Sequence, residues 1–114
     1  PHGHTYRAEI FLESDGLNSL GLVYDFTDLK ERIKTWTDDN WDHAFLVNSQ
    51  DQELIEGLSS TELVRLYKFQ DENPSCEVMS RKLYETTTEL CGFAPSKVRL
   101  WESANQFAEY NGRG

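Results

Sequence analysis

The chain opens with PHGHTYRAEIFL (residues 1–12), and its second half, residues 6–12, alternates as a half-buried β-strand does. Side chains two residues apart in a strand point to the same side, so His2 and His4 would direct their imidazoles toward a common point. Two imidazole nitrogens supply half of a tetrahedral zinc site. Spacing alone leaves a second interpretation open, in which this His-Gly-His is a flexible end or the remnant of a tag.

Length and charge narrow the class of protein. The chain has 114 residues and a formal net charge of −9, so we expect one domain over residues 1–114. Lysine and arginine are scattered, whereas phosphate binding needs clustered positive charge, so we expect neither nucleic acid nor membrane as a partner. No apolar run approaches the roughly 20 residues that span a bilayer. We expect a cytoplasmic protein with Cys76 and Cys91 as reduced thiols.

The beginning of the sequence bears on what the domain contains. The first residue is Pro1, and the candidate metal ligands follow at once. A natural domain seldom begins at its metal ligands. We therefore expect that an N-terminal segment precedes these residues in the native protein.

The rest of the chain predicts both strands and helices. Residues 28–37 have the apolar spacing of an amphipathic helix. Asn73 as N-cap, Pro74 at the first helical position and Gly92 as a stop predict a second helix over residues 74–91. Four further stretches predict strands: residues 20–26, 64–69, 97–102 and 106–110.

Two stretches are harder to assign. Residues 41–48 form a short apolar run, and residues 49–62 are a polar excursion in which Leu54, Ile55 and Leu58 allow one helical turn. The resulting order is strand, strand, helix, strand, helix, strand, strand, with hairpins at both ends. This order is typical of an α+β protein in which helices cover one face of an antiparallel sheet.

Asp42 and His43 lie side by side between large apolar residues. Adjacent side chains on a strand point to opposite faces, so an Asp–His hydrogen bond would need a turn. A histidine here is either packed in the core, or a third zinc ligand, or a general acid–base group suited to neutral pH. The residues alone leave these alternatives open.

Glu102 shares a predicted strand face with Val98 and Leu100, where a carboxylate is costly to bury unless a donor pairs with it. A ligand with several N–H groups in a row would supply such donors. The alternative is a strand end in water. Three residues open the second predicted helix and either contact a ligand or are ordinary first-turn residues: Ser75, Cys76 and Glu77.

Five short segments, in this order, resemble the 6-pyruvoyltetrahydropterin synthase and 6-carboxytetrahydropterin synthase family. They are His2–Tyr6, Val23–Lys30, Asp42-His43, Asn73–Glu77 and Val98–Glu102. The pair Asn73-Pro74 and the tryptophan before Glu102 look most like the bacterial 6-carboxytetrahydropterin branch.

The resemblance implies a tunnelling fold, which is a four-stranded antiparallel sheet with two helices packed on one face. Subunits of this fold join their sheets as trimers into a barrel, and two trimers stack as a hexamer. Such closure would remove exposed sheet edges. The implied substrate is 7,8-dihydroneopterin triphosphate, bound in active sites between subunits.

The resemblance also implies a role for each candidate residue. His2 and His4 would bind zinc, Glu102 would anchor the pterin ring, and Asp42 with His43 would take part in proton transfer. Three residues would line the pterin pocket: Ser75, Cys76 and Glu77. The family's third zinc histidine and its catalytic cysteine belong to a segment that precedes His-x-His.

From these residues and this resemblance we expect a zinc-dependent lyase. It would convert 7,8-dihydroneopterin triphosphate to 6-carboxy-5,6,7,8-tetrahydropterin in queuosine (7-deazapurine) biosynthesis. Two alternatives are a 6-pyruvoyltetrahydropterin synthase and a non-catalytic tunnelling-fold protein that binds a pterin or purine through Glu102.

Overall fold

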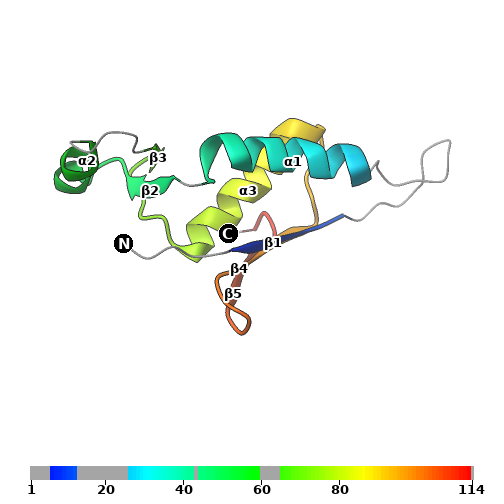
Figure 1. The fold of residues 1–114 in the computed structure, drawn as a ribbon. Coiled ribbons are helices and arrows are strands. Elements are labelled where there is room, and N and C mark those ends of the chain that lie inside the picture. The colour runs from blue at the N-terminus through cyan, green and yellow to red at the C-terminus, as the bar shows by residue number, and fades with distance from the viewer. Residues whose placement is uncertain (1–5, 13–25, 43, 60–64, 114) are drawn as a thin grey trace, which may run out of the picture.

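The computed structural model describes residues 6–12, 26–42, 44–59 and 65–113. Figure 1 shows the chain fold over these ranges. Its elements, in chain order, are β1 (Arg7–Phe11), α1 (Phe26–Asn40), β2 (Phe45–Asn48), α2 (Gln52–Ser59), β3 (Leu66–Phe69), α3 (Cys76–Cys91), β4 (Lys97–Trp101) and β5 (Phe107–Tyr110).

The main sheet is antiparallel and has the strand order β1-β4-β5. Ala8 pairs with Leu100 and Leu100 with Ala108, while Ile10 pairs with Val98. These residues share one face, which we call the inner face, because α3 packs on it and α1 packs on α3 (Figure 1). Helices therefore cover one side of the sheet, as the sequence predicts.

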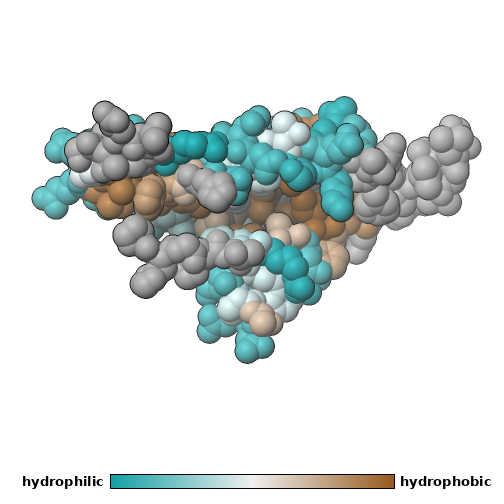
Figure 2. All heavy atoms as spheres, in the orientation of Figure 1, coloured by the Kyte–Doolittle hydropathy of each residue, from teal (hydrophilic) through white to brown (hydrophobic). Residues whose placement is uncertain are grey.

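The core forms between α3 and the inner face. Met79 and Leu83 of α3 are 2% and 1% exposed, and they contact Val98 and Leu100, which are 0% and 2% exposed. Figure 2 shows hydrophobic residues in a band between α1 and the sheet, with hydrophilic residues over the outer surface of α1. The apolar side chains that recur along the helices are thus buried on the side that faces the sheet.

The outer face of the sheet carries aromatic and charged side chains. The Arg99 guanidinium lies 4.7 Å from the ring centre of Phe107 and 5.1 Å from that of Phe11. Arg99 also pairs with Glu109 at 2.5 Å. Alternation along each strand separates this polar face from the apolar inner one.

A second, smaller sheet corrects one expectation from the sequence. Residues 64–69 were expected in the antiparallel sheet, but β3 pairs with β2 in parallel, with Phe45 opposite Leu66. Parallel neighbours need a crossover connection, and α2 provides it. The expected polar excursion over residues 49–62 thus contains a full helix, and the apolar run over residues 41–48 contains β2.

Aromatic rings join the small sheet to the main core. Trp41 packs edge-on against Trp36 of α1 at 5.1 Å and against Tyr67 of β3 at 6.0 Å. Tyr67 in turn meets Phe69 at 5.2 Å, and Phe69 belongs to the buried core. Edge-to-face aromatic pairs at such distances stabilise the fold beyond the contribution from burial of their apolar surface.

The second predicted helix is confirmed with a different N-terminus. Asn73 was expected as the N-cap, but Ser75 has this role, and its side chain accepts a hydrogen bond from the Val78 backbone N–H at 3.2 Å. The Asn73 side chain instead accepts from Asn48 at 3.1 Å. Gly92 ends the helix with φ 80° and donates to the Thr88 carbonyl, as its left-handed conformation allows.

Other expectations are confirmed in part. α1 spans Phe26–Asn40 and so extends beyond the predicted residues 28–37, and Phe26, expected in a strand, is helical. The remaining residues of the predicted strand 20–26, with the hairpin it would form, lie outside the described residues. Cys76 and Cys91 form no disulfide. No helix in the described ranges has the length and apolarity needed to cross a membrane.

Replacement of a core residue tests this packing. Leu83→Ala is expected to lower the free energy of unfolding by about 3 kcal/mol, because it leaves a cavity between α3 and the sheet. Leu54→Ala in α2 is the matched control, since Leu54 is 44% exposed, and it should cost less than about 1 kcal/mol. Urea unfolding followed by circular dichroism measures both, and equal losses would contradict the packing described.

Candidate functional site

The candidate site lies where β1 begins and β4 ends. Arg7 pairs with Trp101, so Tyr6 and Glu102, one residue beyond this pair, lie opposite each other. By alternation they belong to the inner face, in line with Ala8 and Leu100. Glu102 is exposed, and its backbone N–H donates to the Gln106 carbonyl at 3.0 Å in the connection to β5.

The N-terminus of α3 lies over the same end of the sheet. The Cys76 thiol donates to the backbone carbonyl of Leu100 at 3.2 Å, which fixes the first turn of α3 to β4. Ser75 precedes it as the N-cap, and Glu77 follows as an exposed residue. The three first-turn candidates from the sequence therefore lie at the end of the strand that leads into Glu102.

The pKa shifts of two of these residues agree with the closeness that the strand register implies. Burial raises the pKa of the Cys76 thiol, and the negative charge of Glu102 raises this pKa further, with a smaller contribution from Glu77. Burial also raises the pKa of Tyr6, and the negative charges of Cys76 and Glu102 raise it further by smaller amounts. Tyr6 precedes β1, Cys76 opens α3 and Glu102 follows β4. We take these three residues as one group, the candidate site.

This group has defined chemical abilities. A carboxylate accepts hydrogen bonds at two oxygens, so Glu102 suits a ligand with adjacent N–H donors. The raised pKa of Cys76 keeps its thiol protonated near neutral pH, which suits binding rather than nucleophilic attack.

Asp42 lies in the turn that follows α1. Its backbone N–H donates to the Thr37 carbonyl at 2.8 Å, and its own carbonyl accepts from Arg65 at 2.9 Å. The Asp42 side chain is exposed, and its charge contributes to the raised pKa of Lys34, for which the hydrogen bond to Asp38 is the main cause. The structure therefore connects Asp42 with the C-terminal end of α1.

The predicted metal ligands lie outside the described residues. His2, His4 and His43 are the three histidines of the sequence, and none of them falls in the described ranges. Among the residues that the structure does describe, no group of three His, Cys, Asp or Glu could hold a metal ion. Zinc binding by His2 and His4 stays a prediction.

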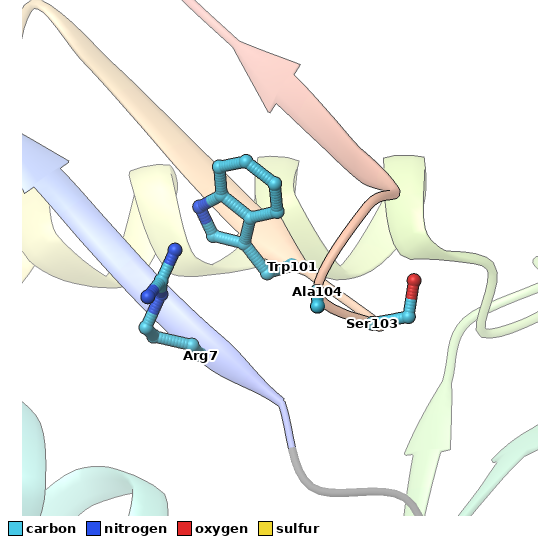
Figure 3. Close-up of a pocket in the computed structure, with 4 residues that line it drawn as sticks. All are labelled: Arg7, Trp101, Ser103 and Ala104. Atoms are coloured by element: carbon cyan, nitrogen blue, oxygen red, sulfur yellow. The ribbon is translucent and has the colours of Figure 1, made fainter.

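An open hollow of about 260 Å³ lies at the same end of the sheet, lined by Arg7, Trp101, Ser103 and Ala104. Figure 3 shows Arg7 on β1 and Trp101 on β4 extending in the same direction from neighbouring strands, next to the turn that carries Ser103 and Ala104. The Arg7 guanidinium lies 4.9 Å from the centre of the Trp101 ring, and the Trp101 indole N–H donates to Glu9. Arg7 and Trp101 belong to the outer face, so this hollow and the Tyr6–Cys76–Glu102 group use opposite faces of one sheet end.

The sequence did not single out Tyr6 as a site residue. Its alternation with Ala8 and Ile10 indicated only a half-buried strand, and its position opposite Glu102 depends on the register between β1 and β4. The available signal was its place two residues after His4, on the same side of a continued strand.

Known proteins resemble this chain over most of its length. A family model described as 6-pyruvoyl tetrahydropterin synthase matches residues 1–113. The 6-carboxy-5,6,7,8-tetrahydropterin synthase of Rickettsia felis is 31% identical over 112 residues, which cover 95% of this chain and 80% of that protein. The protein of the same name from Haemophilus influenzae is 29% identical over 118 residues, and this match covers 96% of this chain and 80% of that protein.

Solved structures show the same fold. A structure of an uncharacterized protein from Wolinella succinogenes matches with a TM-score of 0.76 and 21% identity, covering 98% of this chain and 79% of that one. A mutant 6-pyruvoyltetrahydropterin synthase from Plasmodium vivax matches with a TM-score of 0.64 and 17% identity, covering 96% and 79%. This likeness confirms the α+β tunnelling fold predicted from the sequence.

The charges around Cys76 give a test of the site geometry. Glu102→Gln should lower the pKa of the Cys76 thiol, because it removes the negative charge that contributes more to the raised pKa. Glu77→Gln should lower this pKa less. The pH dependence of iodoacetamide alkylation, measured in a Cys91→Ser background, reports this pKa. Alkylation at fixed mildly alkaline pH should therefore be fastest in Glu102→Gln, then in Glu77→Gln, then in the parent. The reverse order for the two variants would contradict the arrangement.

Proposed function

The chain belongs to the 6-pyruvoyl tetrahydropterin synthase family, and we propose that it is a lyase that converts 7,8-dihydroneopterin triphosphate to 6-carboxy-5,6,7,8-tetrahydropterin. The product follows the names of the relatives, and we place the reaction in queuosine-type deazapurine biosynthesis. The observation that carries the proposal is the exposed Glu102 carboxylate beside the first turn of α3, in a chain of this family.

Glu102 would hold the pterin ring by its edge. A pterin presents a ring N–H and an exocyclic amine side by side, and a carboxylate can accept from both, as it does from a guanidinium. Ser75, Cys76 and Glu77 would line the pocket from the α3 side. A thiol kept protonated by its raised pKa would serve there as a compact, weakly polar surface.

We propose that zinc is the cofactor. His2 and His4 supply neutral imidazole nitrogens, and the sequence places His4 two residues before Tyr6, which lies opposite Glu102. When bound, zinc would supply a Lewis acid for the oxygens of the substrate's side chain. The resemblance assigns the third ligand and the catalytic cysteine to a segment before His-x-His.

Asp42 and His43 would transfer protons during side-chain cleavage. We propose, as the resemblance implies, that the pocket is completed between subunits of a trimer or hexamer. The described part of the sheet supports this proposal, since β5 pairs there only with β4 and leaves its other edge for another strand.

The main alternative product is 6-pyruvoyltetrahydropterin, because the family model carries the name of that activity. Incubation of the full-length protein with 7,8-dihydroneopterin triphosphate, followed by mass identification of the pterin, distinguishes the two products. Substrate that is bound but never converted would support the non-catalytic binder instead.

If Glu102 anchors the pterin ring, removal of its negative charge should greatly lower kcat/KM. Glu102→Gln should lower kcat/KM for 7,8-dihydroneopterin triphosphate about tenfold to a hundredfold, because a charged acceptor of two hydrogen bonds becomes a neutral amide. Glu89→Gln in α3 is the matched control, since Glu89 is also exposed, and its kcat/KM should stay within about twofold of the parent. Similar losses in both variants would remove the special role of Glu102.

The zinc assignment predicts a difference between histidines. The full-length protein should bind about one zinc per chain, and His4→Ala should lose it, because one imidazole ligand is removed. His43→Ala should retain zinc if His43 acts in proton transfer. Plasma mass spectrometry of the purified variants measures both. Zinc retained in His4→Ala, or lost in His43→Ala, would require a different ligand set.

A further inference from the structure

We propose that Tyr6 is a further binding residue of this site, and that its ring packs against the face of the pterin whose edge Glu102 holds. This inference rests on the proposed function. It adds an aromatic contact contributed by the start of β1 to the carboxylate contributed by the end of β4.

The strand register places Tyr6 and Glu102 together. Ala8 pairs with Leu100 and the ladder ends at Arg7 with Trp101, so continuing this register by one residue sets Tyr6 opposite Glu102 on the face of Ala8 and Leu100. The Cys76 thiol donates a hydrogen bond to the carbonyl of Leu100, which lies two residues before Glu102. The first turn of α3 therefore lies close to the end of β4. We call the region between the ends of β1 and β4 and the first turn of α3 the corner of the site.

The burial pattern shows where this corner opens. Leu100 is 2% exposed beneath α3, whereas Tyr6 is 38% exposed although it lies on the same inner face. α3 begins at Cys76 and covers the sheet from there inward. The inner face is therefore covered at Leu100 and accessible at Tyr6, where a planar ligand can contact the phenol ring.

The two residues offer complementary contacts. A carboxylate binds the edge of a heterocycle through its N–H groups, while an aromatic ring contacts the face or edge of the same heterocycle. Contact with Tyr6 would also exclude water from the hydrogen bonds at Glu102, and such bonds are stronger at lower local dielectric. An exposed tyrosine opposite an exposed glutamate thus makes a site for a planar ligand that carries N–H donors.

Binding of neopterin to the full-length protein, followed by quenching of pterin fluorescence, tests the inference without turnover. Tyr6→Leu should raise the Kd about threefold to tenfold because the aromatic contact is lost, and Tyr6→Phe should stay within about twofold because the ring remains. The matched control is Phe107→Leu, which removes another exposed ring from the same sheet, on its outer face. Its Kd should match that of the parent.

Each outcome has a separate meaning. An unchanged Kd in Tyr6→Leu overturns the inference, and so does a Kd in Tyr6→Phe raised as much as in Tyr6→Leu, because the hydroxyl would then carry the effect. An equal rise in Phe107→Leu overturns it as well, since loss of any exposed ring would suffice. A parent protein that binds no neopterin overturns the proposed function itself, and the inference with it.

Discussion

The pairing of β1 with β4 is the constraint on which the site depends, because it joins distant parts of the chain. The Trp101 side chain donates to Glu9 across this pair, and the two residues are 92 positions apart. Closing so long a loop costs conformational entropy, which the burial of Val98 and Leu100 against α3 offsets. A slip of one residue would expose these side chains on the outer face and would separate Glu102 from α3.

The second constraint is the position of α3 on this sheet. Ser75 and Gly92 satisfy free backbone groups at the two ends of the helix, so its length is defined by the local sequence. The hydrogen bond from the Cys76 thiol to the Leu100 carbonyl then sets how far the first turn of the helix extends over β4. The candidate pocket therefore combines residues from elements that the packing of the subunit itself positions, and a site positioned in this way loses less entropy when a ligand binds.

Local patterns in the sequence predicted the elements that local forces determine. The stop at Gly92 and the strands that contain Val98 and Ala108 are confirmed, because capping and alternation act within a few residues. The parallel pairing of β2 with β3 was missed, because it depends on contacts between distant residues, such as Trp41 with Tyr67. The same limit applies to the site, where Glu102 was predicted from its strand but Tyr6 required the register between β1 and β4.

Glu102 shows why the two interpretations offered by the sequence are compatible. The residue lies at a strand end and is exposed, as a structural interpretation requires, yet it also lies beside Tyr6 and the first turn of α3. A carboxylate in water binds a single donor weakly, because water competes for the same lone pairs. Selectivity for a heterocycle must then come from groups that approach Glu102 together with the ligand and exclude water. Among the described residues, these groups are Tyr6, which precedes β1, and the first turn of α3, so the selectivity of Glu102 depends on the packing that places both of them beside it.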